Sequence, residues 1–98
     1  FDFLERRTAQ ALATRLVALL RPGGALYAFF GATAAELRHY TRYTVEAADT
    51  LRLRTTPATP APRNVFVTRD INRMFDGLVV AESVLLKSGT RETLFRKP

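Results

Sequence analysis

The hydrophobic residues near the start of the chain repeat with the period of an α-helix. One helical face collects apolar side chains: Ala9, Ala13, Leu16, Val17 and Leu20. This spacing predicts an amphipathic helix over residues 4–20. Asp2 stands where an N-cap residue would, three residues before Glu5, as in a capping box. Pro22 and Gly23 then end the helix, because proline cannot continue the hydrogen-bond ladder and glycine accepts a positive φ.

The segment that follows this turn is apolar at every position. Residues 25–30 read ALYAFF, with no alternation of apolar and polar side chains. Such a run is typical of a strand buried on both faces, and strands of that kind are mostly parallel and covered by helices. We therefore expect a central parallel strand with Phe29 and Phe30 in the core. Gly31 marks its carboxyl end, where open α/β sheets place their ligands.

Between residues 40 and 54 the period of the pattern changes to two. Apolar side chains alternate there with polar ones, at Tyr43, Val45, Leu51 and Leu53. This alternation predicts a half-exposed antiparallel hairpin over residues 40–54, inserted into the domain. An extended loop follows over residues 55–62 and carries Pro57, Pro60 and Pro62.

The last third of the chain predicts a short helix and a second hairpin. Thr68 is the expected N-cap of a helix over residues 68–75, and Gly77 closes that helix. Residues 78–86 read as a strand, and Ser88-Gly89 turns the chain into an antiparallel partner over residues 90–96.

Three stretches carry a resemblance to a known family: LVALLRPGGALYAFFG at 16–31, TRDINRMFDGLVVAESVLL at 68–86 and GTRETLFRKP at 89–98. They resemble the carboxyl-terminal half of a class I S-adenosylmethionine-dependent methyltransferase. In that family a leucine-rich helix and a Pro-Gly-Gly turn lead into the fifth strand, and a last hairpin adds an antiparallel strand to a parallel sheet. The resemblance implies an α/β fold, the carboxyl-terminal half of a Rossmann-like sheet, with residues 1–98 as a single partial domain.

The resemblance also implies S-adenosylmethionine as cofactor and an unidentified small molecule as methyl acceptor. The family's glycine-rich loop and ribose-binding acidic residue have no counterpart here. Because the chain begins with Phe1 and not with methionine, we expect the upstream part of a longer protein to supply them.

The same resemblance points to site residues. In the family the segment after the fourth strand lines the cleft beside the methyl group, so Asp2 and Phe3 are expected at the cofactor, with helix capping as the alternative role of Asp2. The residues expected to face the substrate are Gly31, Thr33, His39 and Tyr40. His39 could act as a general base or could be a solvated surface histidine. Methyl transfer is an in-line displacement in which proximity and orientation supply much of the rate, so no catalytic constellation is required.

Charge adds a second hypothesis from another functional class. The formal net charge is +6 and the pI is near 10.8, but the basic residues are scattered and form no block. In this alternative the chain is a non-enzymatic basic α/β module whose Arg52, Arg54 and Arg63 contact the phosphates of a nucleic acid or another acidic partner.

Composition limits the remaining options. The chain has no cysteine and one histidine, so it has no disulfide framework and no thiolate metal site, and no metal is expected. No apolar run approaches the roughly 20 residues of a membrane span, and residues 1–20 do not resemble a signal peptide, so a cytoplasmic protein is expected. An open sheet edge would make the isolated 98 residues unstable or self-associating.

Overall fold

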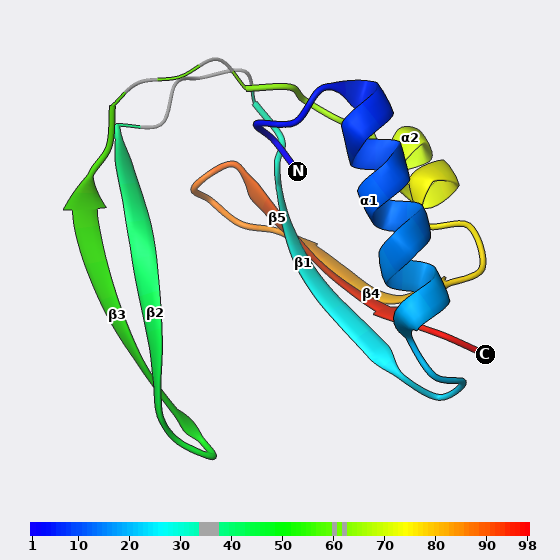
Figure 1. Ribbon diagram of the computed structural model, residues 1–98. Helices are drawn as coiled ribbons and strands as arrows, with labels where there is room; N and C mark the ends of the chain where they lie inside the picture. The colour runs from blue at the N-terminus through cyan, green and yellow to red at the C-terminus, as the bar shows by residue number, and fades with distance from the viewer. Residues whose placement is uncertain (34–37, 60, 62) are drawn as a thin grey trace.

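The computed structural model describes residues 1–33, 38–59, 61 and 63–98. Its elements follow one another along the chain (Figure 1): α1 (Arg6–Leu19), β1 (Ala25–Gly31), β2 (His39–Ala47), β3 (Thr50–Pro57), α2 (Thr68–Met74), β4 (Val79–Leu85) and β5 (Thr90–Arg96). The described strands form a three-stranded sheet of order β1-β5-β4 and a separate two-stranded hairpin of β2 and β3.

Every strand pair among the described residues is antiparallel. β5 lies between β1 and β4 and runs opposite to both. The fold is therefore α+β, and the predicted Rossmann-like α/β sheet with a central parallel strand is wrong. The antiparallel β4–β5 turn was expected, but β5 also takes the place beside β1, so the strand that pairs with β1 is antiparallel to it.

β1 is an edge strand of this sheet and is buried on one face only. Phe30 is 1% exposed, as predicted, but Phe29 is 42% exposed and Tyr27 54% exposed. Residues along β1 alternate between the covered and the open face, so the prediction of burial on both faces is wrong. The apolar run could not show this, because apolar content does not report whether a second layer is present.

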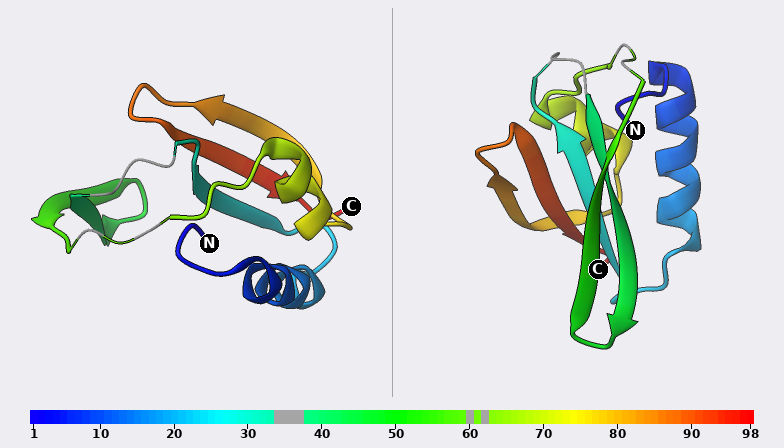
Figure 2. Two further views of the ribbon diagram at one scale, coloured as in Figure 1. Left: turned by 90° about the horizontal axis from the view of Figure 1, so that it is seen from above. Right: turned by 90° about the vertical axis from the view of Figure 1, so that its left-hand side faces the viewer.

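The core lies between the two helices and one face of the three-stranded sheet (Figure 2, left). Its buried members come from both helices, the loop before α2, the C-cap of α2 and strands β1 and β5: Ala9, Ala13, Phe30, Phe66, Ile71, Met74, Phe75 and Phe95. The ring of Phe75 joins the layers, with centroids 6.1 Å from Phe30 and 4.9 Å from Phe95. An ion pair between Arg6 and Asp70, 3.0 Å long, connects α1 with α2.

The turn after α1 is held by the end of the chain. Gly23 has φ +79°, as its place after the helix predicted, and its N–H donates to the Lys97 carbonyl at 2.8 Å. The Lys97 ammonium donates to the carbonyls of Val17 and Leu20 at 2.7 and 2.8 Å. A cation at these last helical carbonyls satisfies acceptors that have no intrahelical partner.

The two predicted helix caps are wrong, although both helices form. The N-cap of α1 is Glu5, which makes no side-chain cap hydrogen bond, and the N-cap of α2 is Val67, so Thr68 is already helical. The Asp2 carboxylate does not cap α1 because it accepts hydrogen bonds from Gly31 and Arg63 instead. These tertiary hydrogen bonds to Asp2 outweigh its local preference for capping the helix.

The β2–β3 hairpin confirms the predicted antiparallel pair over residues 40–54, with both strands somewhat longer. It projects from the rest of the molecule in two views (Figure 1 and Figure 2, left). All of β2 is exposed, as is β3 apart from Thr56, so the hairpin is exposed on both faces and the prediction of a half-exposed hairpin is wrong. Pro57 ends β3, whereas Pro60 and Pro62 of the expected loop lie outside the described residues.

Candidate functional site

A cavity of about 280 Å³ lies at the carboxyl end of β1, where β2 approaches the sheet. Four of the six predicted site residues line it, from three separate parts of the chain: Asp2, Gly31, His39 and Tyr40. Arg63, from the loop before α2, also lines it. The structure therefore brings together residues that are far apart in the sequence.

One wall of this cavity is a buried ion pair. Asp2 Oδ2 accepts a hydrogen bond from the Gly31 N–H at 2.8 Å and another from Arg63 Nη2 at 2.7 Å. The Arg63 and Asp2 side chains are only 7% and 13% exposed. The other carboxylate oxygen, Oδ1, is buried and accepts no hydrogen bond from the described residues. Burying a charged pair is costly unless its partners compensate for the lost water, and here the Gly31 N–H and the Arg63 guanidinium both bind Asp2 Oδ2.

Gly31 is the residue that allows this ion pair to form. A Cβ at position 31 would overlap the Arg63 guanidinium and lie 2.7 Å from Asp2 Oδ2. A backbone hydrogen bond holds the loop that carries Arg63: the Asn64 N–H donates to the Asp2 carbonyl at 2.6 Å. The Asn64 side chain adds a 2.6 Å hydrogen bond to the Leu4 carbonyl. Gly31 thus lies against the Asp2–Arg63 pair instead of facing an open space.

Aromatic rings from β1 and β2 also line the cavity. Phe29 on β1 and Tyr43 on β2 are stacked, with centroids 6.1 Å apart and planes inclined by 20°. Tyr40 is 46% exposed, and His39 is exposed at the start of β2. The cavity therefore combines a fixed charged wall with an accessible aromatic and imidazole wall.

Phe3 and Thr33 do not line this cavity. Phe3 is 57% exposed. Thr33 lies beside the β4–β5 turn, where its Cγ2 is 3.4 Å from the position of a Cβ added to Gly89. Phe1, which the sequence did not single out, packs instead against Phe30 and Phe75, at centroid distances of 5.8 and 5.3 Å.

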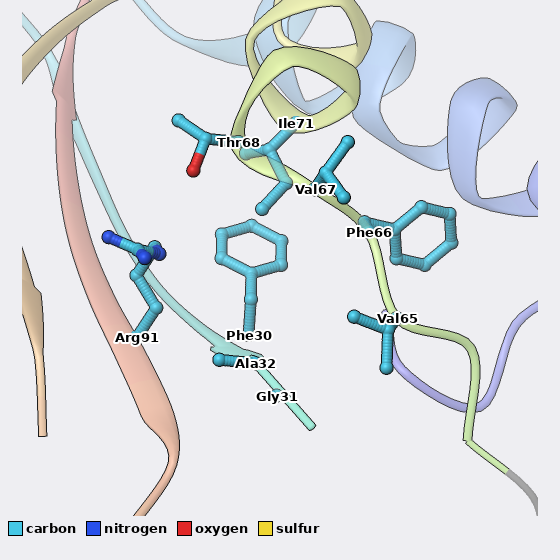
Figure 3. A pocket seen from close by; sticks show the side chains of 9 residues that line it. All are labelled: Phe30, Gly31, Ala32, Val65, Phe66, Val67, Thr68, Ile71 and Arg91. Atoms are coloured by element: carbon cyan, nitrogen blue, oxygen red, sulfur yellow. The ribbon is translucent and has the colours of Figure 1, made fainter. Parts of the chain in front are cut away.

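A smaller cavity of about 190 Å³ lies on the helix-covered side of the same strand end. Phe30 and Gly31 line both cavities. Figure 3 shows Arg91 from β5 and Thr68 from α2 on one side of the Phe30 ring, with Val65 and Phe66 on the other. The carboxyl end of β1 is thus hollowed on both faces.

Electrostatics distinguish Tyr27 on the open face of β1. Desolvation and a hydrogen bond to the Glu92 carboxylate raise the pKa of the Tyr27 phenol above 10.0.

The described residues contain no group of three or more side chains that could hold a metal ion. Neither of the described helices combines the length and the apolarity needed to cross a bilayer.

The three arginines of the phosphate-binding hypothesis are not equivalent. Arg63 is buried against Asp2, and Arg52 forms an ion pair with Glu46 on the hairpin. Arg54 pairs across the hairpin with Arg42, which the sequence reasoning did not select. Of these three arginines, the two exposed ones, Arg52 and Arg54, lie on the hairpin.

Comparisons with protein-family models, with curated proteins and with solved structures found no match to this chain. Its function is accordingly argued from the residues and their geometry.

Proposed function

We propose that the chain is the substrate-side part of an S-adenosylmethionine-dependent methyltransferase that acts on a small molecule. The observation that carries this proposal is the cavity at the carboxyl end of β1, in which Asp2, Gly31 and His39 meet. The cavity supplies a place for a small molecule. The resemblance of residues 16–31, 68–86 and 89–98 to the methyltransferase family suggests the reaction class.

The residues of the cavity suit a planar methyl acceptor. Stacked Phe29 and Tyr43 offer ring faces to such a molecule, and aromatic groups prefer offset stacking of this kind. The His39 imidazole at the exposed side of the cavity would accept the proton that a hydroxyl acceptor loses. The Asp2–Arg63 wall holds the β1 end in position, so the acceptor is oriented by a rigid surface.

Asp2 is also the residue that fits the cofactor best. Its buried Oδ1 accepts no hydrogen bond from the described residues, so it is a ready acceptor for an ammonium or hydroxyl group. Phe3, the other residue expected at the cofactor, lies outside the cavity, so this proposal assigns it no contact with the cofactor. S-adenosylmethionine, when bound, supplies an electrophilic methyl group on a sulfonium.

The size of the cavity limits how much of the acceptor and the cofactor it can hold. At about 280 Å³ it lies just below typical ligand pockets of roughly 300–1,000 Å³, so it suits the acceptor and only one part of the cofactor. The upstream part of the same protein would complete the cofactor site.

A methyl-transfer assay on the full-length polypeptide tests this function. The polypeptide is incubated with S-adenosylmethionine and panels of small phenols, carboxylic acids and amines, and S-adenosylhomocysteine is measured by mass spectrometry. We expect product with at least one panel. His39→Ala should lower kcat/KM roughly tenfold or more without changing the melting temperature, because its side chain is exposed. Thr44→Ala, on the hairpin but outside the cavity, is the matched control. Absence of both cofactor binding and product formation would contradict the proposal.

The second candidate function is binding to nucleic acid through the hairpin. Arg42 and Arg54 stand directly opposite each other, and Arg52 follows on the same face. Like charges in such a cross-strand pair destabilise a hairpin, and the described ion pairs supply no carboxylate to either Arg42 or Arg54. A phosphate group between them would relieve the repulsion. A two-stranded ribbon also fits the major groove of a duplex.

Fluorescence anisotropy with a labelled DNA duplex, repeated across salt concentrations, tests this second function. Two variants each remove two exposed positive charges: Arg42→Ala with Arg54→Ala on the hairpin, and Arg7→Ala with Arg15→Ala on α1. If the hairpin contacts phosphates, only the hairpin variant should reduce the salt slope, by about 2. Equal losses in both variants would show a nonspecific effect of net charge, and no binding at low salt removes the hypothesis.

A further inference from the structure

The hairpin carries an apolar surface that the described chain contacts at one end only, where Tyr43 stacks on Phe29. Register pairs Tyr43 with Leu53 and Val45 with Leu51, so these four side chains share one face, the apolar ribbon face. Their exposures are 53% for Tyr43, 75% for Val45, 55% for Leu51 and 60% for Leu53.

Charge is segregated to the other side of the same ribbon. The opposite face carries all the charged side chains of the central hairpin: Arg42, Glu46, Arg52 and Arg54. A strand pair with one apolar and one charged face is the pattern of a sheet that packs on one side and meets water on the other. The apolar ribbon face therefore has the character of an interior surface.

The hairpin makes little contact with its own molecule. The ring contact between Tyr43 and Phe29 joins it to β1 at the cavity, whereas Val45 and Leu51 lie further out along the projecting ribbon. A lone two-stranded hairpin is at best marginally stable in water, and packing against a further layer is the usual remedy. The outer part of the ribbon needs such a layer.

We propose that the apolar ribbon face binds the same face of a second copy of this chain, giving a two-fold symmetric pair of packed hairpins. An isologous pair requires a surface that complements itself, and an uncharged face of aromatic and aliphatic side chains does so. The arginines of both copies point outward in this arrangement, so the net charge of +6 per chain opposes it only weakly.

The area limits the expected dimer to a weak and reversible one. The aromatic value of roughly 200 Å² is an upper bound for valine and leucine, so burying the exposed fractions of the four residues removes less than about 500 Å² per copy and less than about 1,000 Å² in total. Biological interfaces begin at about that size, at the weak end of the range. We therefore expect the dimer to form only at high protein concentration. The proposal does not depend on methyl transfer, so the two can fail separately.

Sedimentation velocity of the full-length polypeptide over a range of concentrations tests the dimer. Val45→Glu places a carboxylate in the proposed interface, and we expect it to raise the dissociation constant roughly tenfold or more. Thr44→Glu introduces the same charge one residue away on the opposite face and should leave the constant unchanged. Because both positions are exposed, both variants should keep the wild-type melting temperature when monomeric.

Two further outcomes decide against this interface. A wild-type protein that stays monomeric at all accessible concentrations overturns the proposal. So does association that survives Val45→Glu but is lost in Tyr27→Glu, because Tyr27 lies on the open face of the three-stranded sheet and not on the hairpin.

Discussion

Replacing Gly31 by alanine should destabilise the protein through its effect on one buried ion pair. A Cβ at this position would overlap the Arg63 guanidinium and come within 2.7 Å of Asp2 Oδ2. The two charged side chains must then move apart, although they are only 7% and 13% exposed. Separating a buried pair costs about 3–5 kcal/mol. Alanine is better than glycine in a strand by about 0.5–1 kcal/mol, which offsets part of that loss.

The net cost expected for Gly31→Ala is therefore about 2–4 kcal/mol. In a chain of 98 residues this lowers the melting temperature by roughly 10–25 °C. Urea denaturation followed by circular dichroism measures the free energy of unfolding directly.

The decisive control removes the ion pair before adding the methyl group. In the background Asp2→Ala with Arg63→Ala, nothing charged remains to be displaced, and Gly31→Ala should change stability by less than about 1 kcal/mol in either direction. An equal cost in both backgrounds would refute the reasoning, because the loss would then arise from the backbone at position 31.

Three further predictions concern other contacts. Gly23→Val should cost about 1–3 kcal/mol in urea denaturation through its φ of +79° alone, because nothing lies within 4 Å of a Cβ there. Lys97→Met should lower the free energy of unfolding by about 1–3 kcal/mol, since two carbonyls of α1 lose a charged donor; an unchanged value would contradict that role. In an ultraviolet titration Tyr27 should ionise above the ordinary tyrosine pKa of 10.0, and Glu92→Gln should lower the pKa of Tyr27. Because the folded-state pKa is raised, this contribution to stability is present below pH 10.0 and is lost as pH rises through the folded-state pKa.

Local features of the fold were predictable because they depend on neighbours in the sequence. The α1 periodicity, the Gly23 turn and both hairpins follow from spacing and turn chemistry, and the structure confirms them. Strand direction in the three-stranded sheet depends on which distant strand reaches β1. No property of residues 25–30 contains that information.

In the candidate site, too, the sequence predicted what depends on neighbouring residues and missed what depends on distant contacts. Gly31 was singled out because it ends an apolar run, and His39 because it is the sole histidine. Arg63 was considered only as a phosphate contact, because a scattered arginine has no local signature of burial. Asp2 matched a helix-cap pattern, and only the folded chain shows that Gly31 and Arg63 claim its carboxylate.

The central claim is that the carboxyl end of β1 faces the methyl acceptor, and the two glycines at opposite ends of this part of the chain test it most directly. In the full-length polypeptide, methyl-transfer rates of Gly23→Val and Gly31→Ala are measured per folded molecule, at a temperature where both variants remain folded. We predict an unchanged rate for Gly23→Val, which alters only the turn before β1, and a loss of roughly tenfold or more for Gly31→Ala, which displaces the cavity wall. Equal rates per folded molecule in both variants would contradict the claim.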